Sequence, residues 1–435
     1  MTPLLTGLMR RLIRRGRLKL ITAGGRTFNI GDPGSPPVTI RLHDWRVSWD
    51  LLRNPQLKLG EAYMDGRLTV EEGDIADLLD LLTRNLGTGF GGGYLDWLAR
   101  ARFVLGHLAP SNRRGRSRRN VAHHYDLSGD LYRLFLDADR QYSCAFFERF
   151  DDTLEVAQSN KKKRIAAKLA LRRGMRVLDI GSGWGGLGLY LAETHGAEVR
   201  GITLSGEQLD LARARAAGAG LASRVHFSLE DYRETTGRFD RIVSVGMLEH
   251  VGVGNYDTYF RKIAALLADD GVALVHSIGR SDGPGVTNPW IEKYIFPGGY
   301  SPALSEVLPA VERAGLIVTD IEILRLHYAQ TLKEWRRRFV ANRDAARALY
   351  DERFCRMWEF YLAGAEMAFR WQGHVVFQLQ VAKRLDTLPF ARDYMTPKPA
   401  PLNQASIAAV AASGSASCDA PAGRLATAVG RLMPS

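Results

Sequence analysis

The stretch Val177–Gly186 reads V-L-D-I-G-S-G-W-G-G, an apolar strand that runs directly into a glycine-rich turn and a helix. Glycines at a strand-to-helix turn let a flat, polar cofactor lie against the main chain. Gly181, Gly183 and Gly186 satisfy the spacing G-x-G-x-x-G. Taken alone, this spacing is compatible with a dinucleotide, with another nucleoside cofactor, or with a tight turn that binds nothing.

Two details favour S-adenosylmethionine over a dinucleotide. Asp179 lies inside the strand end, two residues before the first glycine, where a carboxylate can meet a cationic amino-acid group. The next predicted strand ends in Thr203-Leu204-Ser205. It therefore lacks the acid that binds the ribose hydroxyls of a dinucleotide about 20 residues after the glycines.

Strand and helix patterns alternate around this motif, as in a parallel sheet with helices on both faces. The predicted strands are 176–180, 198–204, 225–230, 239–245, 272–277 and 316–324, and the predicted helices are 186–194, 206–217, 256–267 and 302–314. Helical residues 331–373 precede a final strand at 377–384, which we expect to be antiparallel. The fold class is therefore α/β, with a doubly wound, Rossmann-like sheet.

The N-terminal region has a different pattern and predicts a smaller α+β domain. It contains short alternating stretches at 38–42, 45–49 and 67–70, a helical pattern at 75–85, a glycine-rich break at 86–94 and a further helix at 94–108. The predicted organisation is an N-terminal lipid- or membrane-associated domain (1–112), a basic linker (113–119), a catalytic domain (120–396) and a disordered tail rich in Ala, Ser and Pro (397–435).

The formal charge of +12 is concentrated in two blocks that imply an anionic partner. Residues 10–19 hold six cations with no acid before Asp32, and residues 113–119 hold five arginines. On a helix, one side would carry Leu4, Leu5, Leu8, Met9, Leu12 and Ile13, and the other Arg10, Arg11, Arg14 and Arg17. Such a helix either lies in an anionic headgroup layer or packs on the protein's own core.

Other features of the sequence indicate where in the cell the protein is located. No run approaches 18 apolar residues, and the first arginines follow the short apolar stretch instead of preceding it, unlike a secretory signal. The cysteines, Cys144, Cys355 and Cys418, are odd in number and lack C-x-x-C spacing. They suggest neither a disulfide framework nor a zinc site, which fits a cytoplasmic protein.

Ligands of doubly wound sheets bind at the carboxyl ends of the strands. The residues expected there are Asp179, Gly181, Gly183, Thr203, Leu204, Gln208, Asp231, Glu249, His276 and Ile278. Glu249 and His276 converge from adjacent strands, and a polar pair at that place has a use if a proton must be moved. Alternatively, Glu249 caps a helix and His276 is a satisfied core histidine. We interpret His250 as structural, because the chain direction points it elsewhere.

Several separate motifs resemble the cyclopropane-fatty-acyl-phospholipid synthase family, which includes the mycolic acid cyclopropane synthases. They are H-H-Y-D-L-S-G-D-L-Y-R-L-F-L-D, Q-Y-S-C-A-F-F, V-L-D-I-G-S-G-W-G-G-L, F-D-R-I-V-S-V-G-M-L-E-H-V-G and N-P-W-I-E-K-Y-I-F-P-G-G-Y-S-P, in that order over residues 120 to about 385. The N-terminal region resembles the extra domain of the phospholipid-acting bacterial members. The match is specific, because five motifs agree in order and spacing.

The resemblance implies a class I methyltransferase fold, S-adenosylmethionine as cofactor and a bicarbonate ion as base. The implied holders of bicarbonate are Cys144, Glu249, His276, Ile278 and Tyr328, with Cys144 and Ile278 acting through backbone N–H groups. The implied cofactor contacts are Tyr142, Ser143, Asp179, Gly181, Gly183, Thr203, Leu204, Gln208 and Asp231. Ser182 stands where the family commonly has cysteine. Relatives also suggest a homodimer.

The implied reaction makes cyclopropane rings on unsaturated acyl chains of membrane phospholipids, at the inner face of the cytoplasmic membrane. Methyl transfer to an alkene leaves a carbocation, so the pocket needs dry, aromatic walls, for which Trp290, Tyr294, Phe296 and Phe369 are candidates, although each is also an ordinary core residue. Alternatives are a related lipid methyltransferase that forms no ring and a non-catalytic cofactor-binding protein. A nucleic-acid methyltransferase is disfavoured, because Asn288-Pro289-Trp290 follows the wrong strand for an amino-methylating motif.

Overall fold

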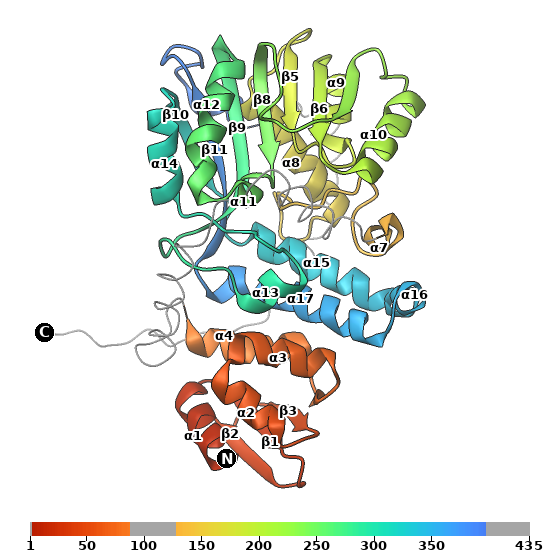
Figure 1. Ribbon diagram of the computed structural model, residues 1–435, viewed down its shortest axis with the longest axis vertical. Coiled ribbons are helices and arrows are strands. Elements are labelled where there is room, and N and C mark those ends of the chain that lie inside the picture. Colours follow the sequence, from red (N-terminus) through yellow and green to blue (C-terminus); the bar gives the residue numbers. More distant parts are fainter. Residues whose placement is uncertain (1, 88–127, 397–435) are drawn as a thin grey trace, which may run out of the picture. The chain divides into compact units, whose positions relative to one another are not determined.

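The computed structural model describes residues 2–87 and 128–396, which contain two β-sheets (Figure 1). The N-terminal elements are α1 (Thr2–Leu12), β1 (Arg17–Ile21), β2 (Thr27–Gly31), β3 (Pro37–Leu42), α2 (Arg46–Arg53), α3 (Pro55–Met64), β4 (Leu68–Glu72) and α4 (Ile75–Leu86). The helix predicted at 94–108, the basic linker and the tail lie outside the described residues.

The second group of elements begins after residue 127. It comprises α7 (Gly129–Arg133), α8 (Leu154–Lys168), β5 (Arg176–Ile180), α9 (Gly186–His195), β6 (Glu198–Thr203), α10 (Gly206–Gly218), β7 (Val225–Leu229), β8 (Phe239–Val245), α11 (Leu248–Val251), η1 (Val253–Asn255), α12 (Tyr256–Leu266), β9 (Leu267–Arg280), α13 (Pro289–Tyr294), α14 (Leu304–Arg313), β10 (Ile317–Ile323), α15 (His327–Ala341), α16 (Arg343–Leu349), α17 (Glu352–Trp371), β11 (His374–Ala382) and η2 (Arg392–Met395).

The larger sheet has seven strands in the order β10-β11-β9-β8-β5-β6-β7. Strands β7, β6, β5, β8 and β9 are parallel, whereas β11 runs antiparallel to both β9 and β10. The strand order reverses between β5 and β8, which is where doubly wound sheets bind their ligands. The predicted α/β, Rossmann-like methyltransferase fold is therefore confirmed.

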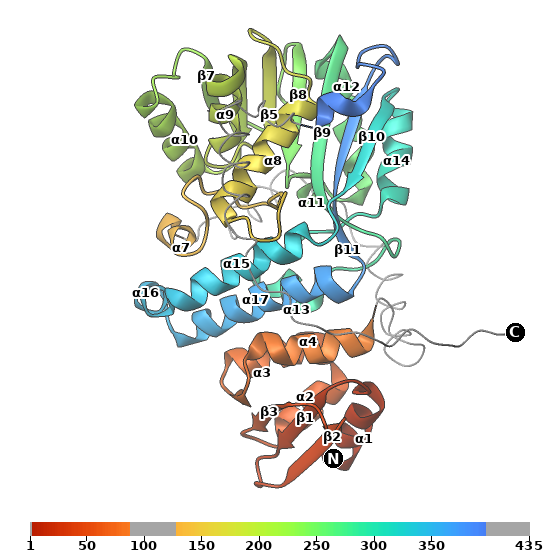
Figure 2. The same ribbon diagram turned by 180° about the vertical axis from the view of Figure 1, so that it is seen from behind.

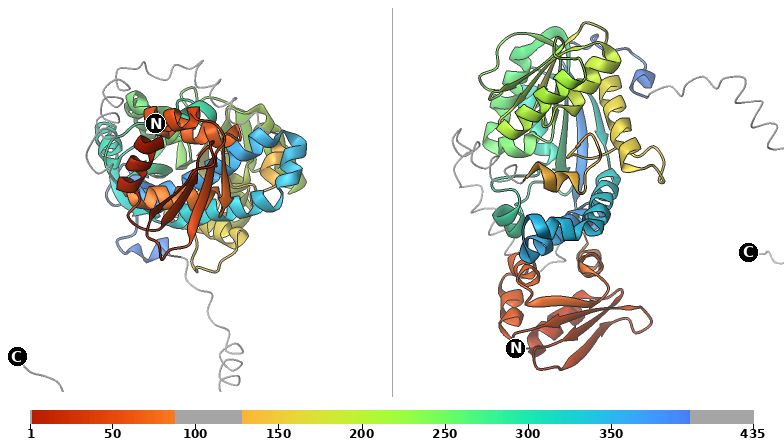
Figure 3. Two further views of the ribbon diagram at one scale, coloured as in Figure 1. Left: turned by 90° about the horizontal axis from the view of Figure 1, so that it is seen from below. Right: turned by 90° about the vertical axis from the view of Figure 1, so that its right-hand side faces the viewer.

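Helices cover both faces of this sheet because its strands are apolar on both sides. Residues of α8, α9 and α10, such as Ile165, Leu191 and Leu209, form one buried cluster with the sheet. Residues of α12 and α14, such as Phe260 and Val307, form the cluster on the opposite face. Figures 1 and 2 show these two helical layers from opposite sides, and the right panel of Figure 3 shows the sheet from its edge.

A helical layer made by α15 and α17 crosses the carboxyl-end edge of the sheet (Figures 1 and 2). Its core includes Trp335 and Trp358, both fully buried. The layer corresponds to the helical pattern predicted at 331–373. It closes the edge at which the parallel strands end, so a site there is shielded from water.

The N-terminal sheet has the order β2-β1-β3-β4. Helices α3 and α4 pack against α17, and the described residues up to Met395 belong to one compact unit. Polar contacts accompany this packing: Trp371 Nε1 donates to Asp80 Oδ1 (2.7 Å), and the Tyr63 hydroxyl donates to Glu359 Oε2 (3.0 Å). The N-terminal part thus shares a core with the helical layer, while the predicted domain boundaries stay predictions.

The alternating stretch at 45–49 is not a strand: Trp45 precedes α2 as its N-cap, and residues 46–49 form its first turn. The Asp44 carboxylate accepts hydrogen bonds from the backbone N–H groups of Arg46 and Val47, at 2.8 and 3.2 Å, and so supports the first turn of a helix. Val47, Ser48 and Leu51 are buried, which is helical spacing. Five residues are too few to distinguish a period of 2 from a period of 3.6.

Helix α1 forms, but it ends at Leu12, so Ile13, Arg14 and Arg17 lie beyond it, and Arg17 begins β1. Its apolar side packs in part on the protein's own core, and contact with a headgroup layer stays a prediction. Leu5, within α1, and Ile13, just after it, are buried in the protein's own core. Leu4 and Leu8 are exposed at 67% and 38%. In the described part of the chain, none of the helices combines the length and the hydropathy that crossing a bilayer requires.

Candidate functional site

The glycine loop after β5 presents bare backbone at the switch point of the sheet. Gly181 and Gly183 adopt φ values of +82° and +54°, in the left-handed region that favours glycine. A Cβ atom placed on Gly183 would have no heavy atom within 4 Å. The loop is therefore shaped for close approach of a ligand, as the sequence predicts.

Asp179 is the buried carboxylate beneath this loop. Its Oδ2 atom is buried and has no hydrogen-bond partner among the described residues. Desolvation raises the pKa of the carboxyl to about 7. A buried polar atom without a partner is costly. Asp179 and the open backbone at Gly183 thus fit a ligand that brings a cationic or hydroxyl donor to this place, as S-adenosylmethionine would.

The remaining predicted cofactor residues lie at the same edge of the sheet. Thr203 ends β6, and its hydroxyl donates to Gln208 Oε1 in the first turn of α10 (3.0 Å). Leu204 connects the two elements. Asp231 follows β7, but its carboxylate binds the Arg233 guanidinium through two hydrogen bonds of 2.9 and 2.5 Å. Asp231 is thus less available to a ligand than the sequence suggested.

The other predicted residues meet at one cavity of about 110 Å³. It is lined by Tyr142, Ser143, Cys144, Glu249, His276, Ile278 and Tyr328. Ligand pockets for drug-sized molecules hold about 300–1,000 Å³. The cavity has room for a small ion, whereas an acyl chain needs further space beside it. The reaction implied by the family resemblance also needs space for an acyl chain, and this cavity by itself does not provide it.

Glu249 and His276 each direct an unpaired buried atom into this region. Glu249 Oε1 accepts the Ile278 N–H (2.6 Å), whereas Oε2 is buried without a partner among the described residues. Desolvation raises the pKa of Glu249 to about 7. The Ile278 N–H expected to hold an anion is therefore already bound to Glu249.

His276 is neutral, because burial lowers its pKa to about 3. The Gln378 side-chain amide lies 3.2 Å from His276 Nδ1, and the direction of the hydrogen bond between them depends on the tautomer of the ring. His276 Nε2 is buried and has no partner within the described ranges. The neutral imidazole is thus held at Nδ1 by Gln378 and keeps Nε2 for a ligand.

The loop of Tyr142, Ser143 and Cys144 is held from beneath by α8. Lys161 Nζ donates to Ser143 Oγ and Gln141 Oε1, both at 2.8 Å, and Gln158 Nε2 donates to the Ser143 carbonyl (3.0 Å). Burial raises the pKa of the Cys144 thiol, so this cysteine is not an activated nucleophile.

Only part of the predicted aromatic wall borders the cavity. Phe296 lines it, and Phe369 packs against Tyr328 with ring centroids 4.8 Å apart. Trp290 and Tyr294 instead contact α3: Trp290 Nε1 donates to Met64 Sδ (3.2 Å), and the Tyr294 hydroxyl donates to Glu61 Oε1 (2.9 Å). For these two, packing is the better interpretation.

Three participants were missed or misjudged from the sequence. His250, interpreted as structural, lines the same cavity. Gln378 was not noticed, although glutamines at 378 and 380 within an otherwise apolar strand were the available signal. Lys161 is a buried cation in a lysine-rich helix, where nothing in the sequence marked it. Among residues 2–87 and 128–396, no group of His, Cys, Asp and Glu side chains could hold a metal ion.

Comparison with known proteins places the chain in a family. The mycolic acid cyclopropane synthetase family matches residues 112–379, and a domain of unknown function matches residues 18–90. A probable fatty acid methyltransferase of Pseudomonas putida is 38% identical, with 81% of this chain and 88% of that protein covered. The cyclopropane-fatty-acyl-phospholipid synthase of Escherichia coli K12 is also 38% identical, with the same coverage.

A solved structure agrees with these relatives. Mycolic acid cyclopropane synthase CmaA1, complexed with SAH and CTAB, superposes with a TM-score of 0.57 at 35% identity, covering 61% of this chain and 97% of that one. The family match spans more than half of the chain. The chain therefore belongs to the mycolic acid cyclopropane synthetase family and is an S-adenosylmethionine-dependent methyltransferase.

Proposed function

We propose that this enzyme transfers a methylene group from S-adenosylmethionine to the cis double bond of unsaturated acyl chains in membrane phospholipids, forming cyclopropane rings. One observation carries the proposal: Glu249 Oε2 and His276 Nε2 are buried without partners in the described structure, and both residues line one small cavity at the carboxyl edge of the sheet. Ring closure requires removal of a proton in a dry site, and this pair suits that task.

The cofactor site of the proposal is the glycine loop with its surroundings. Asp179 would meet the cationic or hydroxyl groups of the cofactor, and Gly181 and Gly183 would lie beneath it. Tyr142, Ser143, Thr203, Leu204, Gln208 and Asp231 complete the proposed contacts. When bound, S-adenosylmethionine supplies an electrophilic methyl group.

A bicarbonate ion fits the cavity by volume and by the chemistry of its lining. The neutral His276 would donate a hydrogen bond from Nε2, with further contacts from Tyr328 and the Cys144 N–H. Ile278 would contribute indirectly, because its N–H holds Glu249 in place. Glu249, with a pKa of about 7, can pass on the released proton through Oε2.

The aromatic side chains around the cavity suit a cationic reaction. Phe296 stands edge-on to Tyr361, with ring centroids 5.8 Å apart, and Tyr328 stands edge-on to Trp335 at the same separation. Aromatic faces stabilise positive charge and exclude water. An acyl chain beside the 110 Å³ cavity requires these side chains to move.

A second candidate is methyl transfer without ring closure, giving methyl- or methylene-branched acyl chains. It is favoured by the relative from Pseudomonas putida, whose name is probable fatty acid methyltransferase. A methyl-branched product keeps every proton of the new methyl group, whereas ring closure removes one of them. We favour ring closure over the methyl-branched product, because Glu249 Oε2 offers that proton an acceptor.

The proposed setting follows from the substrate. We propose that the enzyme works as a peripheral protein at the inner face of the cytoplasmic membrane, as a homodimer and without nucleic acid. The bilayer supplies both the unsaturated chains and an anionic surface for the basic N-terminal residues 10–19. The domain limits 1–112 and 120–396 belong to the same proposal.

The test is a reaction of the full chain with S-adenosylmethionine and vesicles of an unsaturated phosphatidylglycerol. Mass spectrometry and proton NMR of the acyl chains should show one added CH₂ with loss of the alkene. A branched, ring-free chain would establish the second candidate instead. Modification of added RNA with no lipid product would overturn both. If Glu249→Gln kept full ring formation, the assignment of proton removal would be wrong.

A further inference from the structure

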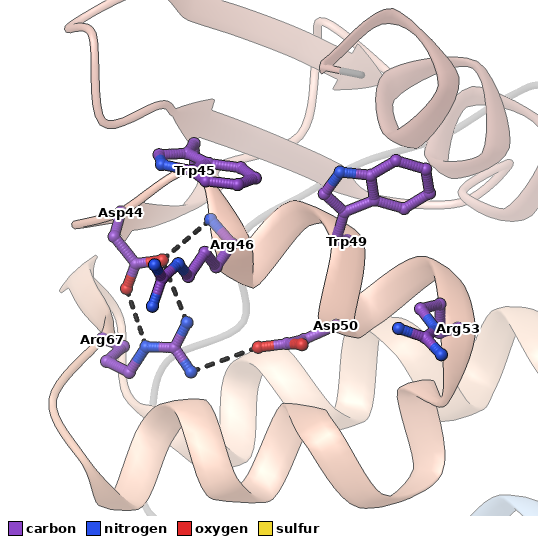
Figure 4. Close-up of a pocket in the computed structure, with 7 residues that line it drawn as sticks. All are labelled: Asp44, Trp45, Arg46, Trp49, Asp50, Arg53 and Arg67. Carbon is purple, nitrogen blue, oxygen red and sulfur yellow. Dashed lines mark hydrogen bonds and ion pairs between the residues drawn. The ribbon is translucent and has the colours of Figure 1, made fainter.

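Helix α2 and its N-cap residue, Trp45, expose two tryptophans and two arginines (Figure 4). Trp45 and Trp49 are 65% and 44% exposed, and Arg46 and Arg53 are exposed beside them. At about 100° per residue, these four positions fall within a single arc of about 100°. We call them the Trp–Arg surface. They border an open depression of about 1000 Å³ on the N-terminal part of the chain.

One side of α2 is buried and packs against the rest of the protein. Val47, Ser48 and Leu51 face the protein's own core. Exposed tryptophans therefore have no structural reason to lie on the opposite side, where they leave large apolar rings in water. Paired exposed aromatic residues with polar neighbours mark interaction sites.

The charges of this surface are not balanced. Arg67 takes up both neighbouring acids: its Nε donates to Asp44 Oδ2 (2.7 Å) and its Nη1 to Asp50 Oδ2 (3.1 Å). Within the described part of the chain, no ion pair involves the Arg46 or Arg53 guanidinium, and that of Arg46 lies 5.7 Å from the Trp45 ring centroid. Three arginines and two aspartates line the depression, so it carries a net charge of +1, and the guanidinium groups of Arg46 and Arg53 stay available to an anionic partner.

We propose that the Trp–Arg surface docks the enzyme on anionic phospholipid membranes, with the tryptophan rings in the headgroup layer and Arg46 and Arg53 on lipid phosphates. Tryptophan favours this layer because its ring is apolar and its N–H is polar. Guanidinium groups bind phosphates with two hydrogen bonds. The inference rests on the proposed function for its choice of a lipid partner, and it moves the main docking contact from α1 to α2.

Other partners fit the surface less well. A nucleic acid is bound by a groove of many cations that follows its phosphates, whereas here two unpaired arginines stand beside two carboxylates. A stable interface with a second copy needs a larger apolar core than two separate rings. Both remain outcomes of the test.

The test compares binding of the full chain to vesicles of dioleoylphosphatidylcholine and to its equimolar mixture with dioleoylphosphatidylglycerol. Trp45→Ser/Trp49→Ser should weaken binding to the mixed vesicles by about tenfold or more. Arg46→Gln/Arg53→Gln should weaken it by about 30-fold, at roughly fivefold for each arginine, and should remove the preference for the anionic lipid. Brominated lipids should quench the fluorescence of the wild type more than that of the tryptophan variant.

Matched controls are Phe390→Ser, which removes another exposed aromatic ring, and Arg26→Gln, which removes another exposed arginine of the N-terminal region. Surface variants that bind like these controls would overturn the inference. So would a change confined to self-association, measured by light scattering, or to RNA binding.

Activity separates this inference from the proposed function. Methyl transfer to the same lipid in detergent micelles should be unchanged in every surface variant and reduced only on vesicles. A wild type that binds vesicles through this surface but modifies no lipid would refute the proposed function and leave the docking surface standing. If the wild type modifies lipid but the surface variants bind vesicles as tightly as the wild type does, the docking surface is refuted and the proposed function stands.

Discussion

Replacing Glu249 by glutamine should stabilise the protein while it abolishes ring formation. The substitution keeps an oxygen for the Ile278 N–H, which now donates to Glu249 Oε1 at 2.6 Å. It removes a carboxyl whose pKa burial raises from 4.5 to about 7. A shift of this size corresponds to about 3 kcal/mol of lost stability once the carboxyl is ionised in both states.

The sign of the pH dependence is fixed by the direction of the shift. The folded state holds the Glu249 proton more tightly than the unfolded state, so wild-type stability falls as the pH rises from about 4.5 to about 7. The glutamine variant lacks this contribution. The two proteins should be about equally stable near pH 4, and the variant should be more stable above pH 7.

The assay is urea unfolding of both proteins, without ligands, at pH 5 and pH 8.5, followed by circular dichroism. The control is Glu193→Gln, an exposed glutamate on α9, whose stability should match the wild type within about 0.5 kcal/mol. A variant no more stable than the wild type at pH 8.5, or a difference independent of pH, would refute the claim that Glu249 is a desolvated proton carrier.

Three further predictions concern the cofactor loop and the contact with the N-terminal part. Asp179→Asn should weaken S-adenosylhomocysteine binding at least about tenfold in calorimetry and remove its pH dependence, since the wild type should bind more tightly above pH 7, where that carboxyl is ionised. Lys161→Met should lower the same affinity about tenfold by releasing Ser143, and unchanged affinity would exclude this positioning role. Glu61→Gln should cost about 1–2 kcal/mol at pH 7 and less as the pH falls through 4.5 towards 2, because the Lys293 and Lys58 amines lower the Glu61 pKa to about 2; equal urea midpoints at pH 7 would contradict this.

Much of the catalytic part could be predicted from the sequence because its signals are local. The apolar strand before Gly181, and the alternation of strands and helices after it, predicted the sheet with nearly correct limits except at β9, which runs over Leu267–Arg280 instead of 272–277. The antiparallel final strand was also expected, and it is β11. Parallel strands end at one edge of a sheet. The positions of Asp179, Glu249 and His276 at strand ends were therefore enough to predict that these residues lie in the same region.

The errors lie where contacts of single side chains, and not the hydrophobic pattern, decide the outcome. The stretch at 45–49 alternates like a strand, but the Asp44 cap and a buried helical face make it α2. Asp231 is at the expected strand end, yet Arg233 occupies its carboxylate. His250 faces the cavity because of the local turn into α11.

The sequence by itself determined the class of sheet, the cofactor loop and which strand ends carry polar groups, because hydrophobic period and glycine placement act over a few residues. Only the tertiary structure decided which of those groups are desolvated and have no hydrogen-bond partner among the described residues. Among residues 2–87 and 128–396, Glu249 Oε2 and His276 Nε2 have no hydrogen-bond partner, because β9 and β11, which are far apart in the chain, meet beside α11 and leave a cavity of about 110 Å³. Desolvation depends on everything packed around a group, and no short stretch of sequence encodes that.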